Sequence, residues 1–316
     1  MKKGKLLTLL PLMLLPFAMT GCNSVKRTIG ICQFVEHPAL DKASEGFMDA
    51  VKKGLGENNV TFDLQVAQED PGTCLTICNT FVSKNVDLIM ANATPAVQAA
   101  ANSTSVIPIL GTSVTEYGVA LDIKDFDGTI GYNVSGTSDL APLDEQAAMI
   151  KTFVPNAQNV GLLFCSAEAN SLYQVNTVEK FLKEQGIITK RISFSESNEL
   201  QAVLTAGIEG LDALYIPTDN VCAKNTTIID SVCRPAKLPV ICGEESLCKG
   251  CGIATLSIDY YALGVKTGEM AVEILKDGKD ITKMPIAYDT NPSKKFNKEI
   301  CEELNITVPE GYVQIA

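Results

Sequence analysis

The sequence has a single histidine, His37, and no tryptophan among its 316 residues. A cysteine nucleophile needs a histidine within hydrogen-bonding reach and a third group that orients it. The cysteine nearest to His37 along the chain, Cys32, falls inside a predicted buried strand. The chain also contains neither a GxxxxGK[ST] nor a GxGxxG phosphate-binding loop. We therefore expect neither catalysis nor a bound cofactor.

Basic residues are also few, because 26 Lys and Arg stand against 37 Asp and Glu, for a net charge of −11. Nucleic-acid-binding proteins contact phosphates through basic patches. This charge balance argues against nucleic acid as a partner, and equally against peripheral binding to an anionic lipid surface.

The apolar run at residues 6–19 is shorter than the ~20 residues that a membrane-spanning helix needs. Lysines precede it, and Met19-Thr20-Gly21-Cys22 follows, a pattern typical of a bacterial lipoprotein signal. Met19 stands where Leu is more usual, and an uncleaved anchor or an ordinary secretory peptide is the alternative. We predict a signal peptide at residues 1–21, lipid on Cys22 and a tether at 22–27, which anchors the protein on the extracytoplasmic face of the cell membrane. Loss of three lysines and no acids would take the net charge from −11 to −14.

The chain has eleven cysteines, a high number for an exported protein. Because the chain is large and 46% hydrophobic, its core does not need disulfides, and buried free cysteines pack as small hydrophobes. The one CxxC, Cys248 to Cys251, favours a disulfide or two thiols on a surface turn over a metal site, since zinc fingers need two such pairs. The ten cysteines besides Cys22 are Cys32, Cys74, Cys78, Cys165, Cys222, Cys233, Cys242, Cys248, Cys251 and Cys301.

Apolar strands alternate with amphipathic helices along the whole chain, which predicts an α/β fold with parallel sheets covered by helices on both faces. In the first half we expect strands at 28–35, 61–67, 86–90 and 106–110, with helices at 39–55, 71–83 and 94–101. In the second half we expect strands at 160–165, 188–194, 213–216, 239–242 and 254–258, with helices at 142–153, 171–185, 200–206, 221–232 and 260–275. A Gly- and Ser-rich crossing near 133–137 separates the halves.

Five segments in this order and spacing resemble one family: 29–41 (IGICQFVEHPALD), 93–96 (ATPA), 167–171 (AEANS), 217–220 (PTDN) and 258–261 (IDYY). The chain is similar over residues 28–306 to the substrate-binding lipoproteins of ABC transporters, in the subgroup for tryptophan and tyrosine uptake. The resemblance implies a two-lobe type I periplasmic-binding fold with a ligand cleft between the lobes and three crossings. Lobe one would comprise 28–137 plus 260–283, and lobe two 138–259 plus 284–316.

Polar residues that follow predicted strands, or open the next helix, are the candidate ligand contacts, because these positions face the cleft. Helix N-termini offer free N–H groups to a carboxylate, and acidic side chains could pair with an ammonium group. Each of these residues has an alternative role as a helix cap, turn or core residue. The candidates are Gln33, Phe34, Glu36, Thr94, Ser113, Asn170, Ser171, Asp219, Asn220, Glu244 and Asp259.

The resemblance implies a monomeric binding protein that captures a small ligand, with an aromatic amino acid as the leading candidate, and delivers it to an ABC permease and its ATPase. Because a fold does not decide function, two alternatives stay open. One is a receptor module that passes the ligand to a sensor. The other is a cysteine-based metal or redox protein.

Overall fold

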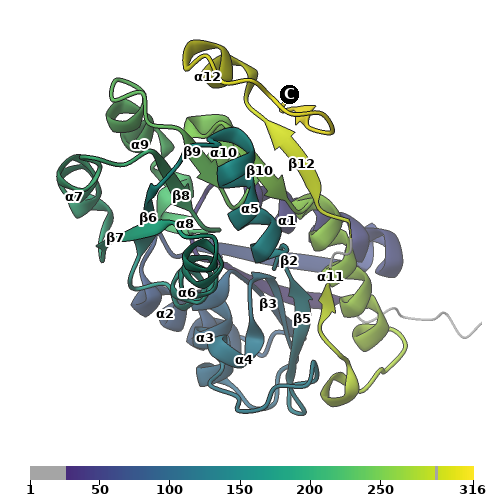
Figure 1. The fold of residues 1–316 in the computed structure, drawn as a ribbon. Helices are drawn as coiled ribbons and strands as arrows, with labels where there is room; N and C mark the ends of the chain where they lie inside the picture. The colour runs from purple at the N-terminus through teal and green to yellow at the C-terminus, as the bar shows by residue number, and fades with distance from the viewer. Residues whose placement is uncertain (1–25, 289–290) are drawn as a thin grey trace, which may run out of the picture.

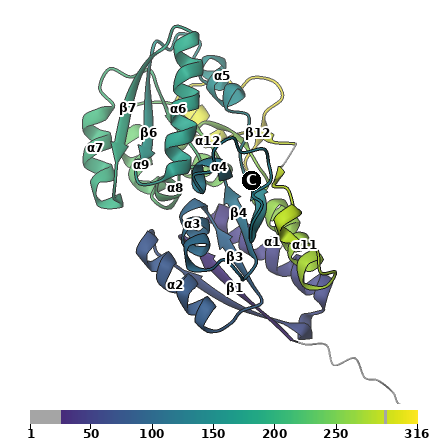
Figure 2. The same ribbon diagram turned by 90° about the horizontal axis from the view of Figure 1, so that it is seen from below.

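The computed structural model describes residues 26–288 and 291–316, which form two α/β lobes, as Figures 1 and 2 show. A six-stranded sheet in the order β11-β5-β4-β3-β1-β2 forms the first lobe, and a seven-stranded sheet in the order β13-β12-β10-β9-β8-β6-β7 forms the second. Helices flank both sheets (Figure 2). The predicted two-lobe α/β fold is therefore confirmed.

The first lobe is built from strands that pair in parallel throughout. Its strands are β1 (Arg27–Gln33), β2 (Val60–Val66), β3 (Leu88–Asn92), β4 (Ile109–Val114), β5 (Val134–Ser138) and β11 (Ala287–Tyr288). Its helices are α1 (Pro38–Leu55), α2 (Pro71–Ser83), α3 (Thr94–Ser103), α4 (Tyr117–Ala120) and α11 (Tyr260–Leu275). Strands β3 and β4 are buried along their whole length, as central strands covered on both faces must be.

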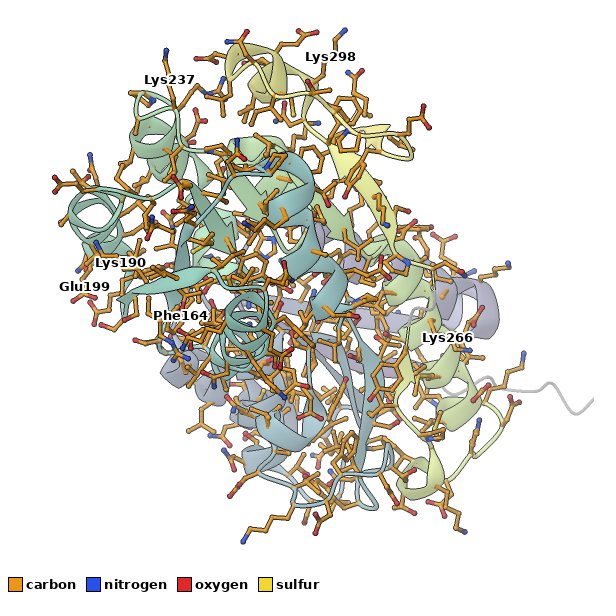
Figure 3. The ribbon with its side chains drawn as sticks, viewed as in Figure 1. Phe164, Lys190, Glu199, Lys237, Lys266 and Lys298 are labelled. Carbon is orange, nitrogen blue, oxygen red and sulfur yellow. The ribbon has the colours of Figure 1, made fainter. Side chains whose placement is uncertain are left out.

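In the second lobe the strands also pair in parallel, except for the antiparallel pair β10–β12. Its strands are β6 (Asn159–Cys165), β7 (Ile188–Phe194), β8 (Ala213–Ile216), β9 (Val240–Cys242), β10 (Ala254–Ser257), β12 (Ser293–Phe296) and β13 (Val313–Gln314). Its helices are α5 (Leu143–Phe153), α6 (Ala169–Glu184), α7 (Leu200–Gly207), α8 (Asn220–Lys224), α9 (Thr226–Cys233), α10 (Glu245–Cys251) and α12 (Lys298–Glu303). Figure 3 shows Phe164 of β6 inside this lobe, and Lys237 and Lys298 on its outer surface.

Several predicted boundaries are wrong. Residues 133–137 are not a plain crossing, because most of them form β5, and the chain leaves the first sheet only after Ser138. The last crossing is also later than residue 283, because β11 pairs with β5 in the first sheet. Residues 221–232 form two helices that break at Asn225. The signal peptide and the lipidated Cys22 lie outside the described residues.

All ten described cysteines are free and buried. Most of them belong to the apolar cores of the two lobes, which confirms their role as small hydrophobes. The expectation for the CxxC is wrong, because Cys248 and Cys251 lie on helix α10, neither on a surface turn nor in a disulfide. In the described parts of the chain no group of three or more His, Cys, Asp or Glu residues is arranged to hold a metal ion. No described helix is long and apolar enough to cross a membrane.

Helices α1 and α11 pack side by side on the first lobe, although more than 200 positions separate their first residues (Figures 1 and 2). Glycines allow this close approach. A Cβ at Gly264 would overlap the backbone oxygen of Ala43, and one at Gly46 would overlap that of Tyr261. Because α11 directly follows a crossing between the lobes, its close packing against α1 fixes the direction of the chain at that crossing.

We expect Gly264→Ala to lower the free energy of unfolding by about 1–3 kcal/mol, because the added methyl group has no room against the backbone of α1. At an unhindered helix position the same change would instead stabilise by up to about 1 kcal/mol. Urea unfolding measures the difference, with Glu269→Ala on the exposed side of α11 as the control. A stabilised Gly264→Ala variant would show that the two helices are not packed this tightly.

Candidate functional site

A closed cavity lies between the lobes, where loops that follow strands of both sheets meet. Its volume is about 10 Å³, the room for one water molecule. A ligand therefore enters only when the lobes move apart. The lining residues are His37, Leu40, Ser113, Thr115, Asp139, Asn170, Thr218, Asp219, Asn220, Ala223, Glu244 and Tyr260.

Hydrogen bonds across the cleft show that the lobes are closed. Nε2 of His37, which precedes helix α1 in the first lobe, lies 3.2 Å from Oδ1 of Asn220 in the second. Gln174 on α6 donates to Oγ1 of Thr115 across a distance of 3.3 Å. The polar side chains between the lobes are thus shielded from water.

Glu168 organises the second-lobe side of the cavity. Its buried carboxylate accepts hydrogen bonds from the backbone N–H groups of Asn220 and Val221 and from the side-chain amides of Asn170 and Asn220. Burial and the negative charge of Asp219 raise the pKa of Glu168, while the surrounding N–H donors act in the opposite direction. These donors fix the orientation of both asparagine amides, so that their carbonyl oxygens face away from Glu168.

Asp139 lies just past the end of β5, where the chain first crosses between the lobes. Its carboxylate accepts hydrogen bonds from Thr115 Oγ1, at 3.1 Å, and from the hydroxyl of Tyr260, at 2.8 Å. Tyr260 opens α11 at the second crossing, so this bond joins two hinge segments. Burial raises the pKa of Asp139.

Asp219 and Glu244 line the cavity as helix N-caps. Asp219 accepts from the backbone N–H groups of Cys165 and Cys222, and Glu244 accepts from those of Ser246 and Leu247. Burial raises the pKa of Glu244 to about 7, against the opposing effect of these hydrogen bonds. Both carboxylates thus combine the capping role with a place at the cavity wall.

Some buried polar atoms have no hydrogen-bond partner in the described structure, and three of these belong to cavity residues: Nδ1 of His37, Oγ of Ser113 and Oδ1 of Asn170. Ser113 also adopts a φ of 54°, in the left-handed region that a serine rarely occupies. Backbone strain and unpaired buried polar groups both occur at functional sites, where a ligand supplies the missing partner.

The structure brings five of the predicted contacts to the cavity: Ser113, Asn170, Asp219, Asn220 and Glu244. The other described candidates do not line it. Phe34, which directly follows β1, is in the apolar core of the first lobe. Gln33 bonds within that lobe to Asp41 and Ser44.

The remaining candidates do not line the cavity either. Thr94 and Ser171 are buried at the starts of α3 and α6, and Oγ1 of Thr94 has no partner. Glu36 is exposed, and Asp259 caps α11 through the N–H of Ala262.

Sequence reasoning missed His37, Asp139 and Tyr260, which all line the cavity. His37 stands directly before Pro38 at a helix start, the same signal that singled out Thr94 before Pro95. Asp139 and Tyr260 follow the two crossings, and their pairing depends on the hinge geometry, which the sequence pattern does not contain.

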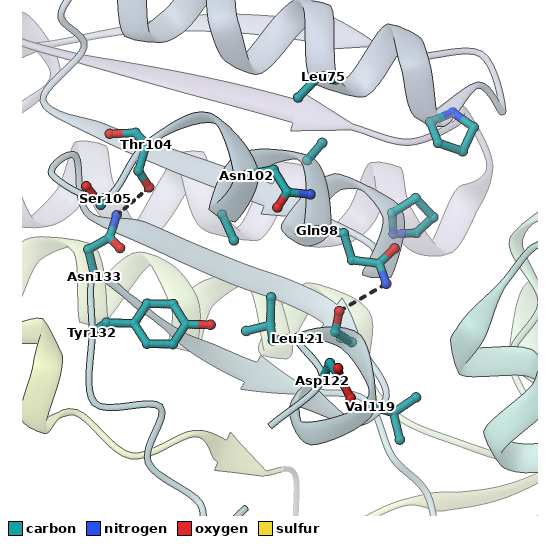
Figure 4. A pocket seen from close by; sticks show the side chains of 15 residues that line it. Leu75, Gln98, Asn102, Thr104, Ser105, Val119, Leu121, Asp122, Tyr132 and Asn133 are labelled. Carbon is teal, nitrogen blue, oxygen red and sulfur yellow. Dashed lines mark hydrogen bonds between the residues drawn. The ribbon is translucent and has the colours of Figure 1, made fainter. Parts of the chain in front are cut away.

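A larger pocket of about 780 Å³ lies on the outside of the first lobe, between α2, α3 and the loop around Tyr132 (Figure 4). The pocket is open, and Gln98 and Asn133 at its wall already donate hydrogen bonds to backbone oxygens. Because one lobe alone forms it, closure of the cleft does not build this pocket.

We expect the free energy of unfolding of the ligand-free protein to depend on pH through the ionisation of Glu244. Its folded-state pKa of about 7 exceeds the ordinary value of 4.5, so its contribution to stability is complete below pH 4.5 and is lost as the pH rises through 7. The free energy of unfolding of the wild type, minus that of Glu244→Gln, should fall by up to about 3 kcal/mol across this range. Thermal unfolding of both proteins at several pH values measures this difference. A difference that does not change with pH would contradict a raised pKa of the buried Glu244 carboxyl.

Solved structures of similar proteins share this two-lobe arrangement. A protein from Streptococcus pneumoniae, solved as an ABC domain in complex with L-Trp, has a TM-score of 0.87 and 29% sequence identity, over 92% of this chain and 100% of that one. A ligand-free, open substrate-binding protein with adhesive properties from Clostridium difficile is 35% identical over 92% of this chain and 100% of that one, with a TM-score of 0.69. The lower TM-score of the more similar sequence agrees with closed lobes here and open lobes there.

Sequence comparisons identify the family. The tyrosine-binding protein of Clostridioides difficile (strain R20291) is 36% identical over 283 residues, which are 89% of this chain and 81% of that protein. The family model described as ABC transporter substrate binding protein matches residues 28–316. The chain belongs to the family of ABC transporter substrate-binding proteins.

Proposed function

We propose that this protein captures an aromatic amino acid in the cleft between its lobes and delivers it to an ABC permease. The observation that carries the proposal is the chemistry of the closed cavity. Its wall presents the carboxylates of Asp139, Asp219 and Glu244 and the unpaired acceptor Oδ1 of Asn170, and neither Lys nor Arg is among its described lining residues. Buried negative charge without a cation is unfavourable, so the cavity favours a ligand that brings a positive charge. The α-ammonium group of an amino acid supplies it.

The α-carboxylate needs donors, and the starts of helices α3 and α6 provide them near the cleft. The first N–H groups of a helix have no partner within it, and the helix dipole favours an anion there. Thr94 and Ser171 are buried at these two helix starts, and the unpartnered hydroxyl of Thr94 adds a donor. We place the ligand carboxylate near these two helix starts, one of which belongs to each lobe.

An aromatic side chain fits the remaining contacts. Leu40, Ala223 and the ring of Tyr260 give the cavity its apolar surface, and ring contacts add to the burial of apolar area. The proposal is supported by two relatives, of which one is a tyrosine-binding protein and the other was solved in complex with L-Trp.

Ligand capture would proceed by a hinge motion. In the open form the ligand contacts one lobe, and closure adds contacts from the other, so that the bound state favours the closed form. The bond between Asp139 and Tyr260 couples the two crossings at which the chain must bend. The closed form would then dock on the permease, where ATP hydrolysis by the partner ATPase releases the ligand.

We also propose that the protein works as a lipid-anchored monomer outside the cell membrane. The basic segment, the apolar run and the sequence Met19-Thr20-Gly21-Cys22 support removal of residues 1–21 and lipidation of Cys22. A diacylated or triacylated cysteine anchors a protein stably without a membrane-spanning helix.

The test is thermal unfolding of the soluble chain from Asn23 with each of the twenty amino acids, nucleosides and sugars, after unfolding and refolding to remove carried-over ligand. An amino acid present at 100 times its Kd should add about 2.7 kcal/mol to the free energy of unfolding. We expect Tyr, Trp or Phe to produce this rise. If only a sugar or nucleoside raised the melting temperature, the amino-acid proposal would fail.

For the best ligand, Asp139→Asn should weaken affinity at least about tenfold, because a buried charge-assisted interaction contributes about 1.5–3 kcal/mol. Asp277→Asn, in the exposed turn that follows α11, is the control and should leave affinity unchanged. Calorimetry measures both. Equal affinities for wild type and Asp139→Asn would remove Asp139 from the ammonium site.

A further inference from the structure

His37 presents an unpaired nitrogen inside the ligand cavity. The side chain is 6% exposed, it lines the cavity, and its Nδ1 has no hydrogen-bond partner within the described structure. Burial lowers the pKa of His37 to about 4, so the ring is neutral at physiological pH. A neutral imidazole carries one N–H donor and one bare acceptor nitrogen.

The hydrogen bonds that link Glu168, Asn220 and His37 determine which ring nitrogen of His37 carries the proton. Glu168 receives the backbone N–H groups of Asn220 and Val221, so both of its oxygens act as acceptors. The side-chain amide of Asn220 therefore turns its NH₂ group to Glu168 and its carbonyl Oδ1 to His37. Because Oδ1 can only accept, Nε2 of His37 must donate to it. Nδ1 is then the bare acceptor.

The position of His37 indicates which part of a ligand it meets. Leu40 lies in the first turn of α1, which His37 precedes, and Ala223 lies one turn after Asn220 on α8, so two of the apolar lining residues come from the segments that form the bridge between His37 and Asn220. Two of the carboxylates on the wall belong to other segments: Asp139 is hydrogen-bonded to Tyr260 at the hinge, and Glu244 is the N-cap of α10, whereas Asp219 directly precedes Asn220. The shared origin of Leu40, Ala223 and the bridge favours placing the side chain of an amino acid beside His37.

We propose that Nδ1 of His37 accepts a hydrogen bond from a donor on the ligand's aromatic side chain, and so selects tyrosine or tryptophan over phenylalanine. The inference rests on the proposed function and deepens it. The phenol O–H of tyrosine and the indole N–H of tryptophan can satisfy Nδ1, whereas phenylalanine leaves it buried and unpaired. A site built around such a bond rejects the analogue that lacks the donor far more strongly than an apolar pocket rejects a change of size.

The first experiment compares affinities for Tyr, Trp and Phe by calorimetry on the soluble chain from Asn23. For the wild type we expect Tyr or Trp to bind about 100-fold or more tighter than Phe. The variant His37→Phe keeps a ring of similar size and removes the acceptor. It should weaken the binding of Tyr and Trp at least about tenfold more than the binding of Phe, because the loss of the bond to Asn220 is common to all three ligands. If His37→Phe fails to fold, His37→Leu serves the same comparison.

The second experiment reads the tautomer directly by ¹⁵N NMR of the imidazole in the wild-type protein. Because His37 is the only histidine of the chain, its two ring nitrogens need no assignment by mutation. We expect the Nε2–H tautomer in the complex, with the Nδ1 resonance shifted by the donor-bearing ligand relative to the complex with Phe. This readout distinguishes a hydrogen bond to the ligand from a purely structural role of His37.

The outcomes separate this inference from the proposed function. Equal affinity of the wild type for Tyr, Trp and Phe would overturn the role of His37 while the amino-acid site stands. A protonated Nδ1 in the complex at neutral pH would do the same. Failure of all three aromatic amino acids to bind would overturn the proposed function and this inference together.

Discussion

The buried carboxylate of Glu168 is the constraint on which the candidate site depends. It is 1% exposed, and within the described chain no ion pair is formed with Lys or Arg, so backbone and amide N–H groups supply its stabilisation. Those donors belong to the starts of α6 and α8, which ties the two helices together behind the cavity. Since the same bonds fix both asparagine amides, one buried side chain determines which atoms the cleft offers to a ligand.

Apolar residues form the cores of the two lobes, and polar residues gather in the cleft between them. Cysteines and aliphatic side chains fill the cores, and the cleft gathers carboxylates, amides and hydroxyls that would be unfavourable in a core. Hydrogen bonds among these polar groups hold most of them in place, and three of the unpaired buried atoms in the described structure belong to residues that line the cavity. A rigid scaffold with a few unsatisfied acceptors is the arrangement that a preorganised binding site requires, because the ligand completes bonds without reordering its partners.

Much of this arrangement follows from the sequence, and the failures have physical causes. The alternation of apolar strands and helices predicts the α/β fold with two halves. Polar residues that follow strands or begin helices predict five residues that line the cleft: Ser113, Asn170, Asp219, Asn220 and Glu244. Phe34 was misplaced because the buried run that begins in β1 continues past its end, without an alternation of apolar and polar residues that would tell core from cleft. β5 was missed because its sequence, VSGTS, is small and polar, and tertiary burial rather than propensity makes it a strand.

Hinge residues are the harder class to find, because their role arises from contacts between segments that are distant in sequence. Asp139 and Tyr260 are separated by 121 positions, and neither stands out alone. Their hydrogen bond joins the first two crossings, and Tyr260 begins the helix that the glycines seat against α1. A ligand charge near Asp139 would therefore act at the point about which the lobes turn. Recognition of the ammonium group and closure of the cleft are then one event, since the carboxylate that would receive the charge also connects the hinge.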